Sequence, residues 1–147
     1  MIAPVLQQRG MKLDFWKIAL RPGKPMLYGR LGGQRVIGLP GNPVSALICA
    51  RVFIVPLIER LGGRSDTAGR VINAIAATDL EENGPRTHFM RATLEIDAGG
   101  NRRVRPVRSQ DSSLLSPLAL ADCLIVRDIA APAARAGDTV GILLLDF

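Results

Sequence analysis

The segment that most constrains the fold of this chain is residues 38–45, with the sequence GLPGNPVS. It follows the β-prone residues 34–37 and opens a long apolar segment, so it predicts a strand, a tight turn and a helix. Asn42 is a good N-cap, and Pro43 suits the first helical position. The free N–H groups of the first helical turn would then favour an anion such as phosphate. The alternative is an ordinary strand-to-helix turn, because short glycine motifs recur in unrelated proteins.

Three cations precede this turn, namely Lys17, Arg21 and Lys24. If residues 15–20 form a strand, Lys17 and Arg21 lie on the same face, because side chains four apart point the same way. Pro and Gly at 22–23 then turn the chain, and Lys24 follows the turn. These cations beside a helix N-terminus predict a site for a phosphorylated or otherwise anionic small molecule. A solvated basic strand edge is the alternative.

The charge of the chain is unevenly distributed. Residues 1–62 carry nine lysines and arginines against two acids, whereas residues 63–147 are close to neutral, within a net charge of +6. A positive potential around the predicted site would steer an anionic substrate toward it. Nucleic-acid binding through bulk charge is disfavoured, because the chain has only six aromatic residues and no nucleic-acid motif.

Residues 43–61 are apolar almost all round, which predicts a buried helix that Pro56 kinks or restarts. The β-branched residues within 52–55 leave a strand possible there. A stretch rich in Gly, Ser and Asp follows at 63–69 and predicts a linker between two domains.

After the linker, the sequence pattern changes to one typical of short strands separated by turns. Strands are predicted at 70–77, 88–97, 103–107, 123–126 and 139–145, with a hairpin turn at 98–101 and a short helical turn at 114–119. Strands separated by Gly-, Asn- and Pro-rich turns indicate a small antiparallel barrel or sandwich.

Other residues limit the class of protein. Cys49 and Cys123 lie in apolar runs and lack metal-ligand spacing, so we expect buried free thiols in a cytoplasmic protein. No segment has the length of a membrane span, and no secretion signal is apparent. His88 is the only histidine, which excludes a two-histidine metal site and favours a structural role. Trp16 is expected to pack in the core.

The sequence PGKP at 22–25 together with LPGNPVS at 39–45 resembles the MoeA family, the molybdopterin molybdenumtransferases, whose eukaryotic relatives include the gephyrin E domain. The resemblance is strongest at 15–62 and thinner at 86–91, 110–112 and 120–126. Family members are much longer, so we expect a C-terminal fragment or a truncated gene product. The resemblance implies an incomplete three-layer α/β/α molybdopterin-binding domain over 1–62, an α/β unit, followed by a β-barrel-like domain over 70–147.

The family resemblance also implies an activity. The family inserts molybdate into an adenylylated molybdopterin and releases AMP, with Mg²⁺ assisting and with a dimer forming the active cleft. The family's magnesium ligands lie in segments absent from this chain, so the chain alone is expected to bind ligand weakly and not to turn over. A non-catalytic scaffold module of the gephyrin type and a simple oxyanion-binding domain are the alternatives.

The resemblance assigns roles to residues of this sequence. It implies catalytic roles for Lys17, Arg21 and Lys24; the family commonly has lysine at the position of Arg21, and arginine there disfavours proton transfer. The substrate-binding residues that it implies are Pro40, Gly41, Asn42, Pro43, Ser45, Arg91 and Ser112. No residue is assigned to a metal.

Overall fold

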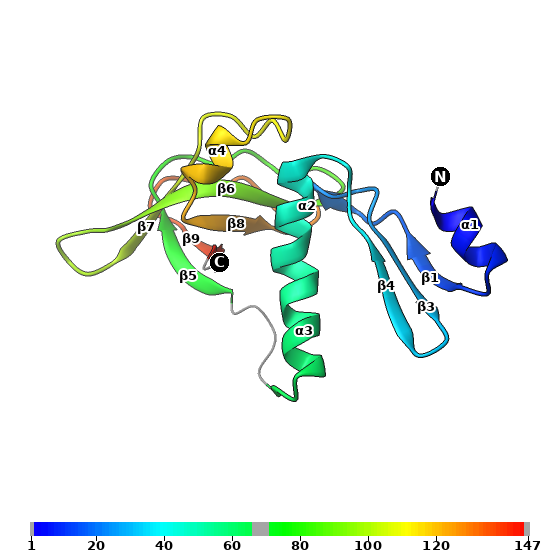
Figure 1. Ribbon diagram of the computed structural model, residues 1–147. Coiled ribbons are helices and arrows are strands. Elements are labelled where there is room, and N and C mark those ends of the chain that lie inside the picture. Colours follow the sequence, from blue (N-terminus) through cyan, green and yellow to red (C-terminus); the bar gives the residue numbers. More distant parts are fainter. Residues whose placement is uncertain (1, 66–70, 146–147) are drawn as a thin grey trace.

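The computed structural model describes residues 2–65 and 71–145. Its N-terminal unit contains a three-stranded antiparallel sheet in the order β1-β3-β4 (Figure 1). Helix α1 (Ile2–Gln8) precedes the sheet, which comprises β1 (Lys12–Trp16), β3 (Leu27–Leu31) and β4 (Gln34–Gly38). Strands β3 and β4 form a hairpin across Gly32 and Gly33, and the positive φ of Gly32 (57°) fits the tight turn.

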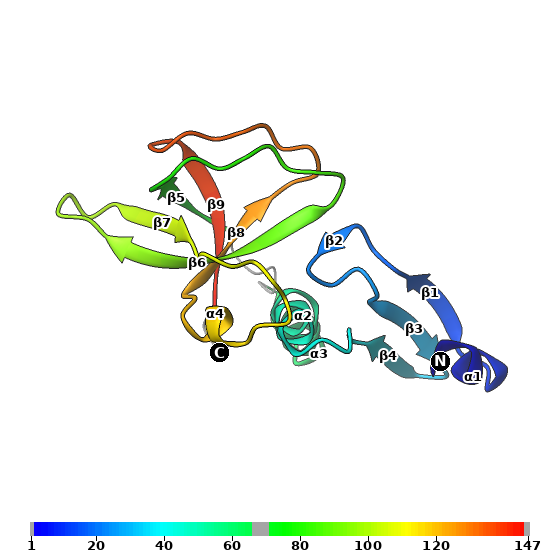
Figure 2. The same cartoon turned by 90° about the horizontal axis from the view of Figure 1, so that it is seen from above.

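The sheet lies between two helical layers, as the predicted α/β/α arrangement requires. On one face, Leu13, Leu27 and Val36 pack with Ala3 of α1. On the other face, Phe15 and Ile37 pack in the cluster that contains residues of helix α2, and Figure 2 shows this helix beside the sheet. The three-stranded sheet therefore has one helix on each side.

One helical rod follows the sheet and runs through three consecutive segments. They are α2 (Pro43–Cys49), the π-helical η1 (Ala50–Ile54) and α3 (Val55–Leu61). The helix restarts one residue before Pro56, which confirms the predicted restart, and the strand alternative for 52–55 is wrong. Proline has no N–H to donate, so the wider π turn before it accommodates the change in hydrogen bonding.

The burial of this rod differs along its length. Val44, Ile48 and Cys49 of α2 are fully buried, whereas Ile58 and Leu61 of α3 are about two-thirds exposed. The prediction of a buried helix is therefore correct for α2 and wrong for α3. The reason is that the barrel packs against the first half of the rod only.

The C-terminal unit is a closed five-stranded barrel. Its strands follow the order β6-β7-β5-β9-β8, and β8 pairs again with β6 to close it. The strands are β5 (Ile72–Ala76), β6 (Thr87–Ile96), β7 (Arg102–Pro106), β8 (Cys123–Arg127) and β9 (Thr139–Leu144), with the short helix α4 (Ser116–Ala119) before β8. These elements confirm the predicted strands, hairpin and helical turn. Closure leaves no free sheet edge among the five strands.

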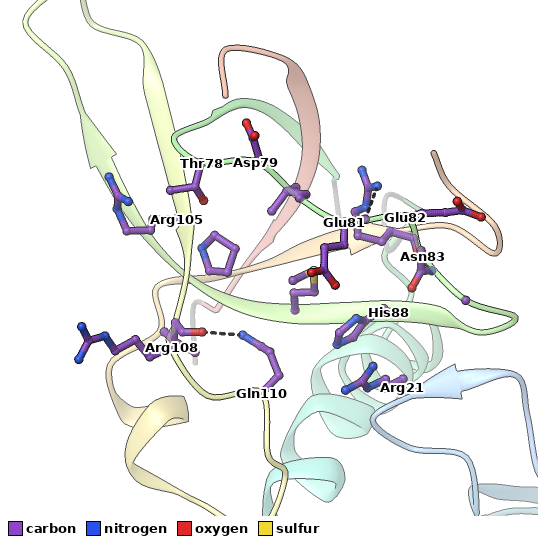
Figure 3. Close-up of a pocket in the computed structure, with 16 residues that line it drawn as sticks. Arg21, Thr78, Asp79, Glu81, Glu82, Asn83, His88, Arg105, Arg108 and Gln110 are labelled. Atoms are coloured by element: carbon purple, nitrogen blue, oxygen red, sulfur yellow. Dashed lines mark hydrogen bonds between the residues drawn. The ribbon is translucent and has the colours of Figure 1, made fainter. Parts of the chain in front are cut away.

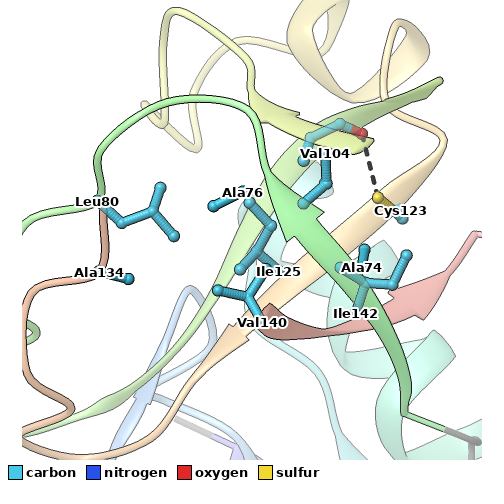
Figure 4. Close-up of a cluster of buried hydrophobic side chains, with 10 residues drawn as sticks. Ala74, Ala76, Leu80, Val104, Cys123, Ile125, Ala134, Val140 and Ile142 are labelled. Atoms are coloured by element: carbon cyan, nitrogen blue, oxygen red, sulfur yellow. Dashed lines mark hydrogen bonds between the residues drawn. The ribbon is translucent and has the colours of Figure 1, made fainter. Parts of the chain in front are cut away.

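Both faces of strand β6 are packed against other elements, so its side chains contribute to two hydrophobic cores. Inside the barrel, Ala92 packs in one cluster with Val104, Ile125 and Ile142, and Figure 4 shows the last three within that cluster. Outside it, Phe89 packs with Ile48 of α2. The short strand β2 (Leu20–Arg21) also pairs in parallel with β6. Helix α2 and strand β2 thus attach the N-terminal unit to the barrel, as Figure 2 shows.

Most of the linker predicted at 63–69 lies outside the described residues, so the domain boundary stays a prediction.

Cys49 and Cys123 are buried free thiols, as expected, and burial raises their pKa values to about 11 and about 12. Among the described residues, no helix combines the length and apolarity needed to cross a bilayer.

Candidate anion-binding site

Three loops, together with Arg86 just before β6, meet at a pocket of about 480 Å³ between the N-terminal unit and the barrel. One loop follows β2, one leads into α2, and one joins β7 to α4. The structure brings seven of the ten predicted site residues to this pocket: Arg21, Lys24, Pro40, Gly41, Asn42, Ser45 and Ser112. The pocket is called the anion pocket below.

The loop after β2 is held against helix α2 by a glycine. Gly23 has φ 119°, and a Cβ added there would lie 2.5 Å from Sγ of Cys49. A larger residue would therefore push the loop away from the helix. The backbone oxygen of Lys24 accepts from the N–H of Ile18 at 3.0 Å, while the lysine itself is exposed. The loop thus fixes the Lys24 backbone and leaves its side chain available to the pocket.

The start of α2 offers fewer free amides than the sequence suggested. Asn42 caps the helix, and its Oδ1 accepts from the N–H of Ser45 at 3.2 Å. Pro43 has no N–H, and the N–H of Ala46 donates to the backbone oxygen of Asn42. The prediction that the amides of this turn form a free cradle is therefore wrong for these positions. The positive side chains must supply most of the attraction for an anion.

Lys17 lies elsewhere than predicted. Strand β1 ends at Trp16, and Lys17 takes a left-handed conformation with φ 71°, so residues 15–20 do not form one strand. Lys17 is absent from the lining of the anion pocket, and its Nζ lies 5.1 Å from the centre of the Trp16 ring. Trp16 is 43% exposed, so its expected place in the core is also wrong. The turn at Lys17 interrupts the alternation on which both predictions relied.

Arg91 supports the pocket from behind rather than lining it. The residue is 1% exposed, and its guanidinium donates to the backbone oxygens of Ser109 (3.2 Å), Asp111 (3.1 Å) and Leu114 (3.3 Å). Burial lowers its pKa from the usual value of arginine. These bonds fix the loop that carries Ser112, so we assign Arg91 a positioning role.

Six lining residues were missed as site candidates, and two of them, Gln110 and Arg86, bear directly on the pocket. Gln110 accepts from the N–H of Arg91 at 3.0 Å and donates to the backbone oxygens of Arg91 and Val107. Its amide therefore joins the loop to strand β6. Arg86 adds an exposed cation to the pocket. The only sequence signal for either was the thin family resemblance at 86–91 and 110–112.

The electrostatics of the anion pocket favour negative ligands. Among the described residues that line it, Arg21, Lys24 and Arg86 are cationic and only Asp111 is acidic. The Asp111 carboxylate accepts from the N–H and Oγ of Ser113, both at 2.9 Å, and these bonds lower its pKa. The described residues contain no cluster of three metal-ligating side chains. One carboxylate among three cations suits an oxyanion and not a divalent cation.

Comparison with known proteins agrees with this arrangement of domains. The family described as "Probable molybdopterin binding domain" matches residues 1–60. The family described as "MoeA C-terminal region (domain IV)" matches residues 73–145. This chain belongs to the MoeA family. The two matches lie on the N-terminal unit and on the barrel, respectively.

Relatives of this MoeA chain cover nearly all of it. It is 37% identical to the molybdopterin molybdenumtransferase of Haemophilus influenzae over 94% of this chain and 34% of the relative. The Staphylococcus aureus enzyme of the same name is 27% identical over 90% of this chain and 31% of the relative. The chain therefore spans about a third of the length of these curated relatives.

Solved structures show the same fold. A molybdopterin biosynthesis MoeA protein from Pyrococcus horikoshii superposes with a TM-score of 0.80 at 26% identity, covering 99% of this chain and 34% of that one. A molybdenum cofactor biosynthesis protein from Pyrococcus furiosus gives a TM-score of 0.71 at 22% identity, covering 90% of this chain and 45% of that one. The MoeA fold thus extends over both units.

A second and larger cavity adjoins the anion pocket in this MoeA chain. Its volume is about 690 Å³, and it lies over one end of the barrel (Figure 3). The two cavities share Arg21 and Gln110. A ligand longer than a single oxyanion could therefore extend from one into the other.

Proposed function

We propose that this chain acts in molybdenum-cofactor biosynthesis, as part of a site that inserts molybdate into an adenylylated molybdopterin and releases AMP. The supporting observation is the convergence of Arg21, Lys24 and Ser112 on one pocket, from elements far apart in the sequence. The relatives named molybdopterin molybdenumtransferase supply the reaction class.

The residues of the anion pocket would act by binding and orientation. Arg21, Lys24 and Arg86 would neutralise the oxygens of molybdate or of a substrate phosphate. The hydroxyls of Ser45 and Ser112 would donate hydrogen bonds to the same oxygens. Fixing the oxyanion beside the pterin sulfurs lowers the entropic cost of the reaction, and the cations stabilise negative charge as AMP leaves.

The position of Lys17 gives it a different place in this proposal. Its ammonium lies over the Trp16 ring and outside the pocket lining, so it would contribute long-range attraction rather than a contact. The anion pocket does not fit Mg²⁺, because Asp111 is its only carboxylate among the described lining residues and already accepts two hydrogen bonds. We therefore derive no step through magnesium from these residues.

The complete reaction would require more protein than this chain supplies. The relatives are about three times as long, and we propose, as the family resemblance implies, that a homodimer completes the active cleft. We therefore propose that the chain alone binds molybdate and phosphate without turnover. Release of AMP from adenylylated molybdopterin and molybdate by the isolated chain, at the rate of a full-length relative, would contradict this part of the proposal.

The three lysines of the chain provide a direct test of the binding site. Calorimetry with molybdate, phosphate and AMP should show at least a tenfold loss of affinity for Lys24→Ala. Lys17→Ala should weaken binding only slightly, because this variant loses only a long-range attraction to the anion. The loss should be smaller still at high salt, which screens that attraction. Lys12→Ala is the matched control, since Lys12 is an exposed residue of β1. Equal effects of all three substitutions would contradict the proposed site.

A further inference from the structure

The larger cavity is the mouth of the barrel. Residues His88 and Met90 of β6 and Arg127 of β8 form its floor, and loop 78–84 and residues 105–108 form its sides. Its volume of about 690 Å³ falls in the range of small-molecule sites, which often occupy barrel mouths. Met90 packs against the barrel core, so the floor is partly apolar.

One buried polar atom on this floor has no hydrogen-bond partner among the described residues. The Nε of Arg127 is buried without a hydrogen-bond acceptor among the described residues, although the same guanidinium donates to the backbone oxygens of Glu81 and Pro132. The His88 side chain lies on the same floor and is 7% exposed. A buried polar atom without a partner is rare in folded proteins and costs free energy, so Nε of Arg127 indicates an external partner.

These two groups lie side by side. His88 and Arg127 are directly opposite each other in the antiparallel pairing of β6 with β8. Burial and the charges of Arg21, Arg86 and Arg91 lower the pKa of His88 to about 4. The imidazole is therefore neutral near pH 7, with one nitrogen that donates and one that accepts. Together the pair presents two donors and one acceptor to the cavity.

The side of the cavity adds a carboxylate. Figure 3 shows Glu81 pointing from its loop toward the part of the cavity where His88 and Arg21 lie. Arg21 and Gln110 continue from there into the anion pocket. The cavity therefore offers an acceptor at its rim, donors at its base and an apolar surface beside them, with a route to a phosphate site.

We propose that the barrel mouth binds the amino-substituted, fused nitrogen heterocycle of a phosphorylated ligand, the pterin or the adenine ring, while the phosphate occupies the anion pocket. The ring amino group would donate to Glu81, a ring nitrogen would accept from Nε of Arg127, and a ring face would rest on Met90. His88 would complete the hydrogen bonds along the ring edge. The assignment of the phosphate rests on the proposed function.

The single histidine makes this proposal testable without altering the protein. NMR signals of the imidazole come from His88 alone. In the 147-residue chain, AMP or 6-hydroxymethylpterin should shift these signals, whereas ribose 5-phosphate should leave them in place. AMP should also bind at least tenfold more tightly than ribose 5-phosphate, if adenine is the ring; a response to the pterin alone identifies the pterin instead.

Two substitutions separate the heterocycle from the phosphate. Glu81→Gln should weaken binding of the responding ring compound at least fivefold and leave the affinity for ribose 5-phosphate unchanged. Glu95→Gln is the matched control, because Glu95 is an exposed residue of β6 outside the cavity lining. Lys24→Ala should weaken ribose 5-phosphate binding and leave the His88 shift with 6-hydroxymethylpterin intact.

The outcomes distinguish this proposal from the proposed function. If ribose 5-phosphate binds and neither ring compound moves the His88 signals, the heterocycle site is overturned and the anion pocket stands. If 6-hydroxymethylpterin moves them while ribose 5-phosphate and phosphate do not bind, the barrel mouth is supported and the anion pocket is overturned. Absence of binding by every compound overturns both.

Discussion

The barrel and the N-terminal unit bury their apolar side chains to different extents. The barrel closes on itself, and residues such as Ile125 and Ile142 are fully buried inside it. The N-terminal sheet has only three strands, and Ile2, Trp16 and Leu39 remain exposed on that unit. Two of the three cations that line the anion pocket, Arg21 and Lys24, come from the more open N-terminal unit, whereas the barrel unit supplies Arg86 and the loop that carries Ser112. The N-terminal unit therefore contributes most of the positive charge, and the barrel unit, through Arg91, holds a lining loop in place.

The largest expected effect tests whether the barrel core contributes more to stability per side chain than the small core beneath α1. Ile125→Ala removes a fully buried side chain from the barrel and should lower the free energy of unfolding by about 4 kcal/mol. Leu27→Ala acts in the small cluster beneath α1 and should cost about 2 kcal/mol, because neighbours there can relax toward solvent. Urea denaturation of both variants measures the difference. Equal losses would remove the distinction between the two units.

The next effect concerns the support that the barrel gives to the anion pocket. Arg91→Met leaves three backbone oxygens without their donor and should cost about 3 kcal/mol of stability. It should also weaken molybdate binding, because the loop carrying Ser112 loses its attachment. Arg102→Met, at an exposed position of β7 outside both cavities, is the control for loss of charge. Calorimetry and urea denaturation separate the two effects; an unchanged variant would mean that the loop holds its position without Arg91.

A smaller effect is the pH dependence that His88 gives to the barrel. Its pKa falls from 6.5 to about 4 on folding, so the unfolded state binds more protons between these values. Stability should therefore decrease as the pH is lowered from about 6.5 to about 4, by on the order of 2 kcal/mol. The variant His88→Gln should lack this component. Parallel stability–pH curves for the two proteins would refute the assignment.

The smallest effect belongs to the N-terminal unit. Asn42→Ala removes the cap of α2 and should cost about 1 kcal/mol. It also frees the N–H of Ser45 beside the anion pocket. Phosphate affinity should consequently fall little or even rise, whereas stability falls. Asn73→Ala, at an exposed position of β5, serves as the control in both measurements.

The same contrast explains what could be predicted from the sequence. The barrel strands were predictable because alternation and turn residues are local signals, as along β6 and its hairpin with β7. The burial of both faces of β6 was less apparent, since Phe89 packs against a helix about forty residues earlier in the chain. Pairing between distant segments leaves no periodic mark in the sequence.

The site was predictable to the extent that its residues lie in short motifs. Lys24, Asn42 and Ser45 belong to such motifs, and the structure brings them to one pocket. The predicted position of Lys17 was wrong because its left-handed backbone conformation ends the strand. Residues other than glycine rarely adopt this conformation, so the sequence does not indicate a turn there. The support from Arg91 and Gln110 was not visible, because it depends on backbone oxygens that every residue carries.

The place of Trp16 has a practical consequence for folding experiments. The chain has one tryptophan, and it stands partly exposed at the end of β1, under the ammonium of Lys17. Indole fluorescence will therefore report on the edge of the open sheet and be nearly blind to the barrel. If the two units melt separately, emission will change at one denaturant concentration and far-ultraviolet circular dichroism will continue to change at another. Coinciding curves would instead identify a single cooperative unit joined through α2.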